Sequence, residues 1–147
     1  MKTNPVVEMV VHLGALQGAE PSFKTDGAAA MDLHMPECLT LQAGETKKVQ
    51  TGISLALPDN ICGLILSRSG LGSSGLVIAH GLGLLDPDYR GTLILPLYNR
   101  SRSSIKLTEG QAVAQLLFLP FVRPTIKKVA EFSTKTARGS GGFGSTG

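Results

Sequence analysis

The stretch that decides the fold is residues 46–67, TKKVQTGISLALPDNICGLILS. Thr46–Thr51 is a polar run around Val49, and mainly apolar residues fill Ile53–Leu57 and Cys62–Ser67. We interpret this pattern as an apolar period of two. A period of two is typical of β-strands. Pro58-Asp-Asn60 lies between the last two runs, as expected for a turn. The stretch therefore predicts three consecutive short strands.

The same alternation continues on both sides of this stretch. Further strands are expected at Val6–Val11, Ala30–Met35, Thr92–Tyr98, Ser104–Leu107, Ala112–Phe121 and Ile126–Phe132. Only Ser69–Gly75 offers a turn of helix. Pro96 cannot donate to a sheet, so we expect it at an edge or a bulge. Many short strands separated by turn residues predict an all-β fold, a sandwich or a barrel.

Composition sets the class of protein. The 147 residues suit one domain, and 42% hydrophobic residues can build a core. The 18 Gly and 8 Pro argue against a helical bundle. No apolar run is long enough to cross a membrane and no signal segment is evident, so we expect no membrane association. Cys38 and Cys62 lack metal-site spacing, which predicts reduced thiols and a cytoplasmic location.

Charge is uneven along the chain. Residues 1–73 contain 5 basic and 7 acidic residues, whereas residues 74–147 contain 9 and 4. A basic second half indicates an anionic ligand, although a solvated face would have the same composition. No block of Lys and Arg is dense enough to predict binding to nucleic acid.

The last fifteen residues differ from the rest. Residues 133–147 contain five Gly and six Ser or Thr, which cannot bury enough apolar area to form a core. We therefore divide the chain into a β domain at 1–132 and a flexible arm at 133–147. A frayed terminus is the simple interpretation. Arg138 and Phe143 are unusual in a mere linker, and the surrounding backbone N–H groups offer donors to an anion.

Four polar positions interrupt the strand pattern. Asp32 lies among apolar neighbours and should face either solvent or a site. Arg68 lies between two serines just before a glycine, an arrangement that suits an anion. Asp86-Pro-Asp88 has the composition of a turn. Gln115 lies within the most apolar strand, so it must either bind a ligand or satisfy the backbone.

Together, and in this order, these stretches resemble the five motifs of the trimeric dUTPases, which hydrolyse dUTP to dUMP and pyrophosphate. The matching pieces are short but are distributed along nearly the whole chain: Ala29–Leu33, Arg68–Leu71, Gly83–Gly91, Gly110–Gln115 and Arg138–Thr146. The resemblance implies a distorted, jelly-roll-like β-barrel that assembles as a homotrimer. Such an enzyme keeps uracil out of DNA and supplies dUMP for dTMP synthesis.

The resemblance also implies a mechanism. Asp86 would be the general base that orients and deprotonates the water attacking the α-phosphate. Carboxylates are weak bases at neutral pH, so positioning must contribute much of the effect. Mg²⁺ would be held mainly by the three phosphates and water, which suits this hard ion. Asp32 would be an outer-shell ligand that reaches the ion through water.

Substrate contacts follow from the same resemblance. The implied phosphate contacts are Arg68, Ser69, Gly70 and Gln115. Tyr89 would pack under the deoxyribose and reject UTP, and backbone groups around Gly83 would bind uracil in a pocket too tight for thymine. Phe143 would stack on uracil when the arm crosses to a neighbouring subunit. The implied arm contacts are Arg138, Gly142, Phe143, Ser145 and Thr146.

Two positions depart from the family pattern. Ala112 stands where the fourth motif usually has Arg, which removes one supporting contact. His80 stands where many bacterial members have Asn, which weakens a side-chain role in binding the base and leaves a structural role as the alternative.

Two rival functions remain to be weighed. A dCTP deaminase shares the fold but needs a Glu where this chain has Pro96, and no Glu occurs between residues 46 and 108. A non-catalytic β-trimer that keeps a nucleotide pocket is the other. The presence of Asp86, Tyr89 and the whole arm argues against it.

Overall fold

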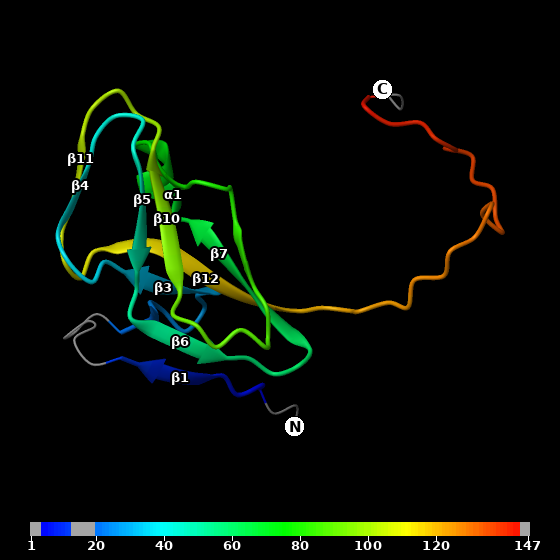
Figure 1. Cartoon of the computed structure of the whole chain (residues 1–147), viewed down its shortest axis with the longest axis horizontal. Coiled ribbons are helices and arrows are strands. Elements are labelled where there is room, and N and C mark those ends of the chain that lie inside the picture. Colours follow the sequence, from blue (N-terminus) through cyan, green and yellow to red (C-terminus); the bar gives the residue numbers. More distant parts are fainter. Residues whose placement is uncertain (1–3, 13–19, 145–147) are drawn as a thin grey trace.

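The computed structural model describes residues 4–12 and 20–144, which form twelve strands and one short helix (Figure 1). In chain order these elements are β1 Glu8–Val11, β2 Ser22–Phe23, β3 Ala30–His34, β4 Leu39–Leu41, β5 Thr46–Gln50, β6 Ile53–Ala56, β7 Ile61–Ser67, α1 Ser69–Ser73, β8 Leu76–Ile78, β9 Gly83–Leu85, β10 Ile94–Asn99, β11 Ile105–Leu107 and β12 Ala112–Pro120. The prediction of an all-β fold is confirmed.

The strands pair antiparallel in four small sheets. The largest has the order β2-β3-β12-β7-β9, and a second has the order β5-β10-β8. Two-stranded sheets β1-β6 and β11-β4 complete the arrangement. This is the distorted, jelly-roll-like architecture that was predicted. Among the described residues, no helix is long and apolar enough to cross a membrane.

The core lies between the inner faces of these sheets. Leu33 of β3, Leu95 of β10 and Leu116 of β12 are each fully buried, at 0% exposure. Alternation in β10 also turns Asn99 inward, where it is fully buried. Its side-chain nitrogen donates to the Leu41 carbonyl at 3.1 Å and to the Ser103 carbonyl at 2.7 Å. Both N–H groups of this buried amide therefore have an acceptor, so its burial leaves no unpaired donor. The bond to Leu41 also links β10 to β4.

Pro96 occupies an unexpected position. The prediction placed it at an edge or a bulge, yet β10 is the middle strand of its sheet and Pro96 pairs in register with Lys48. The Ala79 N–H donates to the Pro96 carbonyl at 2.8 Å, one residue beyond the end of β8. The backbone N of Pro96 faces the same side as its carbonyl, toward the chain that follows β8. Because β8 has already ended there, the missing N–H removes no hydrogen bond between paired strands.

The predicted strand at Ile126–Phe132 is wrong. After Pro120 the described chain contains no further strand, and Figure 1 shows it extending away from the sheets. Ile126 is 85% exposed and Phe132 is 90% exposed. Apolar residues recur in this segment without a strict period of two, and among the described residues no strand pairs with it. The division of the chain at residue 132 stays a prediction.

Four short strands were not predicted: β2, β4, β8 and β9. Each has only two or three residues, which is too short for alternation to be counted. β9 matters most for function, because it forms the edge of the largest sheet and leads directly into Asp86.

Candidate active site in two pockets

The largest sheet brings the first, second and fourth motifs together. Gln115 of β12 lies opposite Asp32 of β3 on one side and opposite Leu66 of β7 on the other. The chain leaves β7 at Ser67 and enters α1 after Arg68. Three neighbouring strands therefore place Asp32, Arg68 and Gln115 on one part of the surface.

Arg68 connects these strands. Its Nε lies 3.3 Å from Asp32 Oδ1, and its Nη1 donates to the Ala112 carbonyl at 2.9 Å. Asp32 is only 8% exposed, whereas the Arg68 side chain is 38% exposed, so the carboxylate is buried and the guanidinium still reaches solvent. The Gln115 side-chain nitrogen donates to the Ser67 carbonyl at 3.0 Å. Gln115 thus satisfies the backbone, and Asp32 faces the site and not bulk solvent.

These side chains border a hollow of about 440 Å³. Its lining consists of Lys24, Ala28, Ala29, Ala30, Asp32, Leu66, Arg68, Ser69, Gln115 and Leu117. A second hollow on the other side of Arg68 is lined by Arg68, Ser69, Gly70, Leu71, Gln111 and Ala112. We call the two together the Arg68 pocket. Two cationic side chains and the serine hydroxyl equip it for an anion.

The third motif lies in a separate pocket. This cavity of about 260 Å³, which we call the Asp86 pocket, is lined by Ile65, His80, Leu82, Gly83, Leu84, Leu85, Asp86, Tyr89, Leu93, Ile94 and Pro96. Asp86 begins a turn in which the Tyr89 N–H donates to the Asp86 carbonyl at 3.2 Å. The turn expected from Asp86-Pro-Asp88 is therefore present, and its first residue faces the cavity.

One wall of the Asp86 pocket is backbone. A Cβ at Gly83 would lie 3.3 Å from Ile65 Cβ and 3.4 Å from His80 Cε1. His80 Nδ1 lies 2.8 Å from the Leu82 carbonyl, and because a carbonyl only accepts, Nδ1 carries the hydrogen. The histidine ring therefore has a hydrogen-bond partner in its own loop, and it lines the cavity beside Gly83. Its structural role stays a prediction.

The two pockets are separate in one chain and share no lining residue. Between β3, which carries Asp32, and β9, which leads to Asp86, lie both β12 and β7. At about 4.8 Å per strand, three spacings place β3 and β9 about 14 Å apart across the sheet. The predicted site residues are therefore brought together as two groups and not as one.

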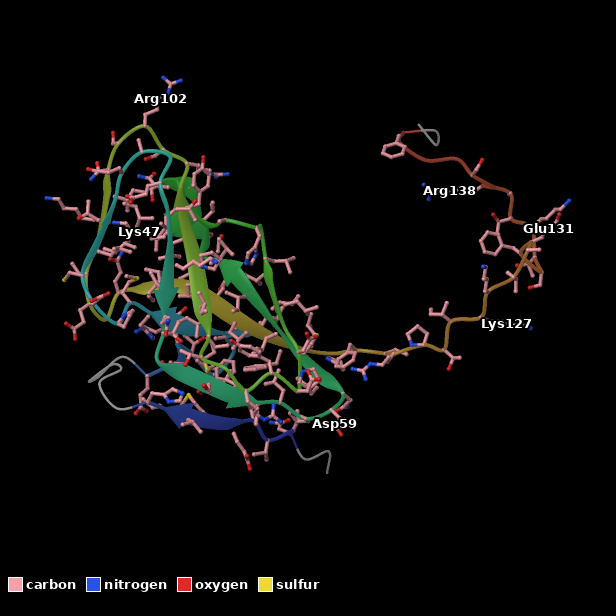
Figure 2. All side chains as sticks on the ribbon, in the orientation of Figure 1. Lys47, Asp59, Arg102, Lys127, Glu131 and Arg138 are labelled. Carbon is pink, nitrogen blue, oxygen red and sulfur yellow. The ribbon has the colours of Figure 1, made fainter. Side chains whose placement is uncertain are left out.

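The arm lies apart from both pockets. Figure 2 shows Arg138 on the extended segment, far from the sheets. Its Nε donates to the Gly141 carbonyl at 2.9 Å, so its contacts are local. Phe143, between Gly142 and Gly144, has φ of 50° and a fully exposed ring, a conformation that is rare for a bulky residue. Ser145 and Thr146 lie outside the described residues.

Lys24 was not predicted as a site residue. It follows β2, which pairs with β3 so that Ser22 lies opposite Asp32, and it lines the Arg68 pocket. Only the pairing of β2 with β3 shows this, and a two-residue strand gives no periodic signal. Within residues 4–12 and 20–144, no three His, Cys, Asp or Glu side chains gather to hold a metal ion.

Comparison with known proteins agrees with this geometry. Residues 17–147 match the dUTPase family. A deoxyuridine 5'-triphosphate nucleotidohydrolase of Psychrobacter sp. is 43% identical over 131 residues, covering 86% of this chain and 85% of the relative. The corresponding protein of Francisella tularensis subsp. novicida is 41% identical, covering 86% and 88%.

Solved structures resemble the fold closely. The dUTPase of Staphylococcus bacteriophage 80alpha, determined with dUPNHPP, superposes with a TM-score of 0.87 at 25% identity, covering 97% of this chain and 98% of that one. The dUTPase of phage phi11 of S. aureus superposes with a TM-score of 0.78 at 23% identity, covering 88% and 99%. With the family match across nearly the whole length and relatives above 40% identity, this chain belongs to the dUTPase family.

Proposed function

We propose that this protein hydrolyses dUTP to dUMP and pyrophosphate, by attack of water on the α-phosphate. The observation that carries the proposal is the Asp86 pocket, where a carboxylate lies beside a backbone wall at Gly83 and the ring of Tyr89. The relatives named as dUTP nucleotidohydrolases, at 43% identity, support the same substrate. We further propose that it acts in the cytoplasm.

The Asp86 pocket suits the nucleoside end of the substrate. The wall at Gly83 offers backbone donors and acceptors, and Ile65 and His80 leave little room beside it. Uracil can hydrogen-bond such a backbone edge, whereas the methyl group of thymine needs additional space. Tyr89 is 43% exposed and offers its ring as a platform for the deoxyribose.

The Arg68 pocket suits the triphosphate. The guanidinium of Arg68 is held by Asp32 and the Ala112 carbonyl, so it is ordered before an anion arrives. Ser69 and Gly70 begin the segment after Arg68, and Lys24 adds a second positive charge to the lining. We propose that the phosphates lie here, with Gln115 beside them.

Mg²⁺ fits these residues as a partner of the substrate. Asp32 supplies one carboxylate in the Arg68 pocket, which suits an ion held mainly by phosphate oxygens and water. When bound, Mg²⁺ supplies charge neutralisation on the triphosphate. Asp32 would hold it through water, and Arg68 keeps that carboxylate oriented.

The reaction then needs one proton acceptor. Asp86 accepts the proton of a water molecule as the water oxygen forms a bond to the α-phosphorus. The bond from that phosphorus to the bridging oxygen of the β-phosphate breaks, and pyrophosphate leaves with the electron pair. Asp86 later returns the proton to solvent.

One substrate must reach both pockets, so we propose that sites form between subunits of a homotrimer. The separation of Asp86 from Asp32 within one chain supports this arrangement, because a second chain can supply the phosphate contacts. The exposed arm supports it too. The Phe143 ring is fully exposed, and an exposed aromatic ring is a ready contact for another subunit or for a bound base.

Pyrophosphate release from dUTP, dTTP, dCTP and UTP tests the activity. We expect rapid release from dUTP alone, and loss of that release with a chelator, because the pocket excludes the other bases and sugars. Release of ammonia from dCTP, with dUTP as the product, would favour the deaminase. No release from any nucleotide, with dUTP still bound, would favour the non-catalytic β-trimer.

Complementation tests the shared site. We expect Asp86→Asn and Arg68→Ala to be inactive separately, and a co-expressed mixture to regain activity. If one chain supplies Asp86 and another Arg68, about one site in four of a random mixture has both groups intact. Sedimentation should give a mass three times the 15.4 kDa of the chain. A mixture without activity would contradict sites shared between subunits.

A further inference from the structure

The ring of Tyr89 folds back over the chain that follows it. Its phenolic Oη donates to the Thr92 carbonyl at 3.1 Å, three residues further on. Tyr89 also lines the pocket that contains Asp86. The direction of this ring therefore sets the shape of the cavity.

Gly91 lies directly beneath the ring. A Cβ built at Gly91 would lie 2.3 Å from Tyr89 Oη, 2.5 Å from Cζ and 3.0 Å from Cε2, and these are its three nearest atoms. Gly91 is exposed and is not among the glycines with positive φ. Its backbone would therefore accept an alanine, and the tyrosine ring is the nearest obstacle to a side chain there.

The turn before the ring is held by several hydrogen bonds. The Tyr89 N–H donates to the Asp86 carbonyl at 3.2 Å. Arg90 Nη1 donates to the carbonyls of Pro87 at 2.6 Å and of Tyr89 at 3.1 Å. The atoms nearest to a methyl group at position 91 belong to the ring and not to this turn. The ring has the freer path, because rotation about χ1 moves it without breaking the turn.

We propose that Gly91 is a positioning residue for sugar recognition: the absence of a side chain there allows the Tyr89 ring to lie flat against the backbone, bonded to Thr92, in the orientation that the deoxyribose needs. The inference rests on the proposed function for its substrate. An ordinary carbon contact begins at 3.4 Å, so a methyl group at 2.3 Å must displace the phenol by about 1 Å.

Gly91→Ala is the direct test. A displacement of about 1 Å near the reacting groups costs on the order of a hundredfold in rate, so we expect a fall of that size in kcat/KM for dUTP. The preference for dUTP over UTP should also fall, by about tenfold, since the ring no longer closes the space at the 2′ position. Gly72→Ala is the matched control, because a Cβ there meets nothing within 4 Å. The melting temperature should be unchanged in both variants.

Two variants of Tyr89 show whether Gly91→Ala acts through the tyrosine ring or through some other disturbance of the site. With Tyr89→Leu as background, no ring remains to be displaced, so adding Gly91→Ala should cost less than twofold in kcat/KM. With Tyr89→Phe as background, Cζ still lies 2.5 Å from the new methyl carbon, and the full loss should persist. Equal losses in all three backgrounds would contradict the proposal, as would Gly91→Ala with unchanged selectivity.

Nuclear magnetic resonance gives a readout that needs no activity. The chain has two tyrosines, Tyr89 and Tyr98, so labelling at Cζ gives two signals that Tyr98→Phe assigns. We expect Gly91→Ala to shift the Tyr89 signal and leave the Tyr98 signal in place. An unmoved Tyr89 signal would overturn the inference. Absence of pyrophosphate release from the unaltered protein would instead overturn the proposed function.

Discussion

Replacing Asp86 by Asn is expected to lower the turnover of dUTP by about 10²–10⁴-fold, the range that general-base catalysis contributes. The amide keeps the shape of the side chain but cannot accept the proton of the attacking water. Because the residue lies on an exposed turn at the pocket edge, the fold should be unaffected. Single-turnover kinetics and a dUTP binding titration measure the two effects separately.

Asp88→Asn is the matched control for this prediction. Asp88 lies on the same turn, is also exposed and carries the same charge, but it is not among the residues that line the Asp86 pocket. Its replacement should change turnover by less than threefold. Equal losses in the two variants would indicate that turnover depends on the total negative charge of the turn and not on one carboxylate. Unchanged turnover in Asp86→Asn would show that Asp86 is not the general base.

The long strands were predictable because their alternation is fixed by burial. In β10, Leu95, Leu97 and Asn99 face the core while their neighbours do not. The strand was predictable from its short apolar run, although Ile94 and Tyr98 on the other face are apolar too. Ile126–Phe132 was expected to be a strand from its apolar residues, but within residues 4–12 and 20–144 no strand pairs with it. Alternation indicates which residues share a face, whereas it contains no information on whether an edge is available to pair.

The site was predictable residue by residue but not in its arrangement. Asp32, Arg68 and Gln115 were each singled out as polar interruptions of apolar strands, and the structure places them together. Their separation from Asp86 depends on the order β3-β12-β7-β9. Strands far apart in sequence become neighbours through long connections, which local patterns do not specify. The contact of Gly91 with Tyr89 was not predictable either, because it depends on the direction in which the tyrosine ring points.

Deleting the chain after Thr136 is expected to leave a folded protein of unchanged assembly with turnover lowered by about a hundredfold, the cost of losing a group that closes the site and excludes water. The described residues beyond this point are linked only among themselves or to Thr136, as in the bond from the Gly139 N–H to the Thr136 carbonyl. Their removal therefore exposes no core. Circular dichroism, sedimentation and pyrophosphate release measure fold, assembly and turnover.

A pair of point variants identifies what the arm supplies. Phe143 and Phe132 are both almost fully exposed on the extended segment, so both lose a similar apolar area on replacement by Ala. If the arm closes over the site, only Phe143→Ala should lower turnover, because stacking on the base is worth about 1–3 kcal/mol. Equal losses of turnover in the two variants would show that removing any exposed aromatic ring from the segment has the same effect, and that Phe143 has no specific role. Unfolding or dissociation of the truncated chain would show instead that the arm holds the assembly together.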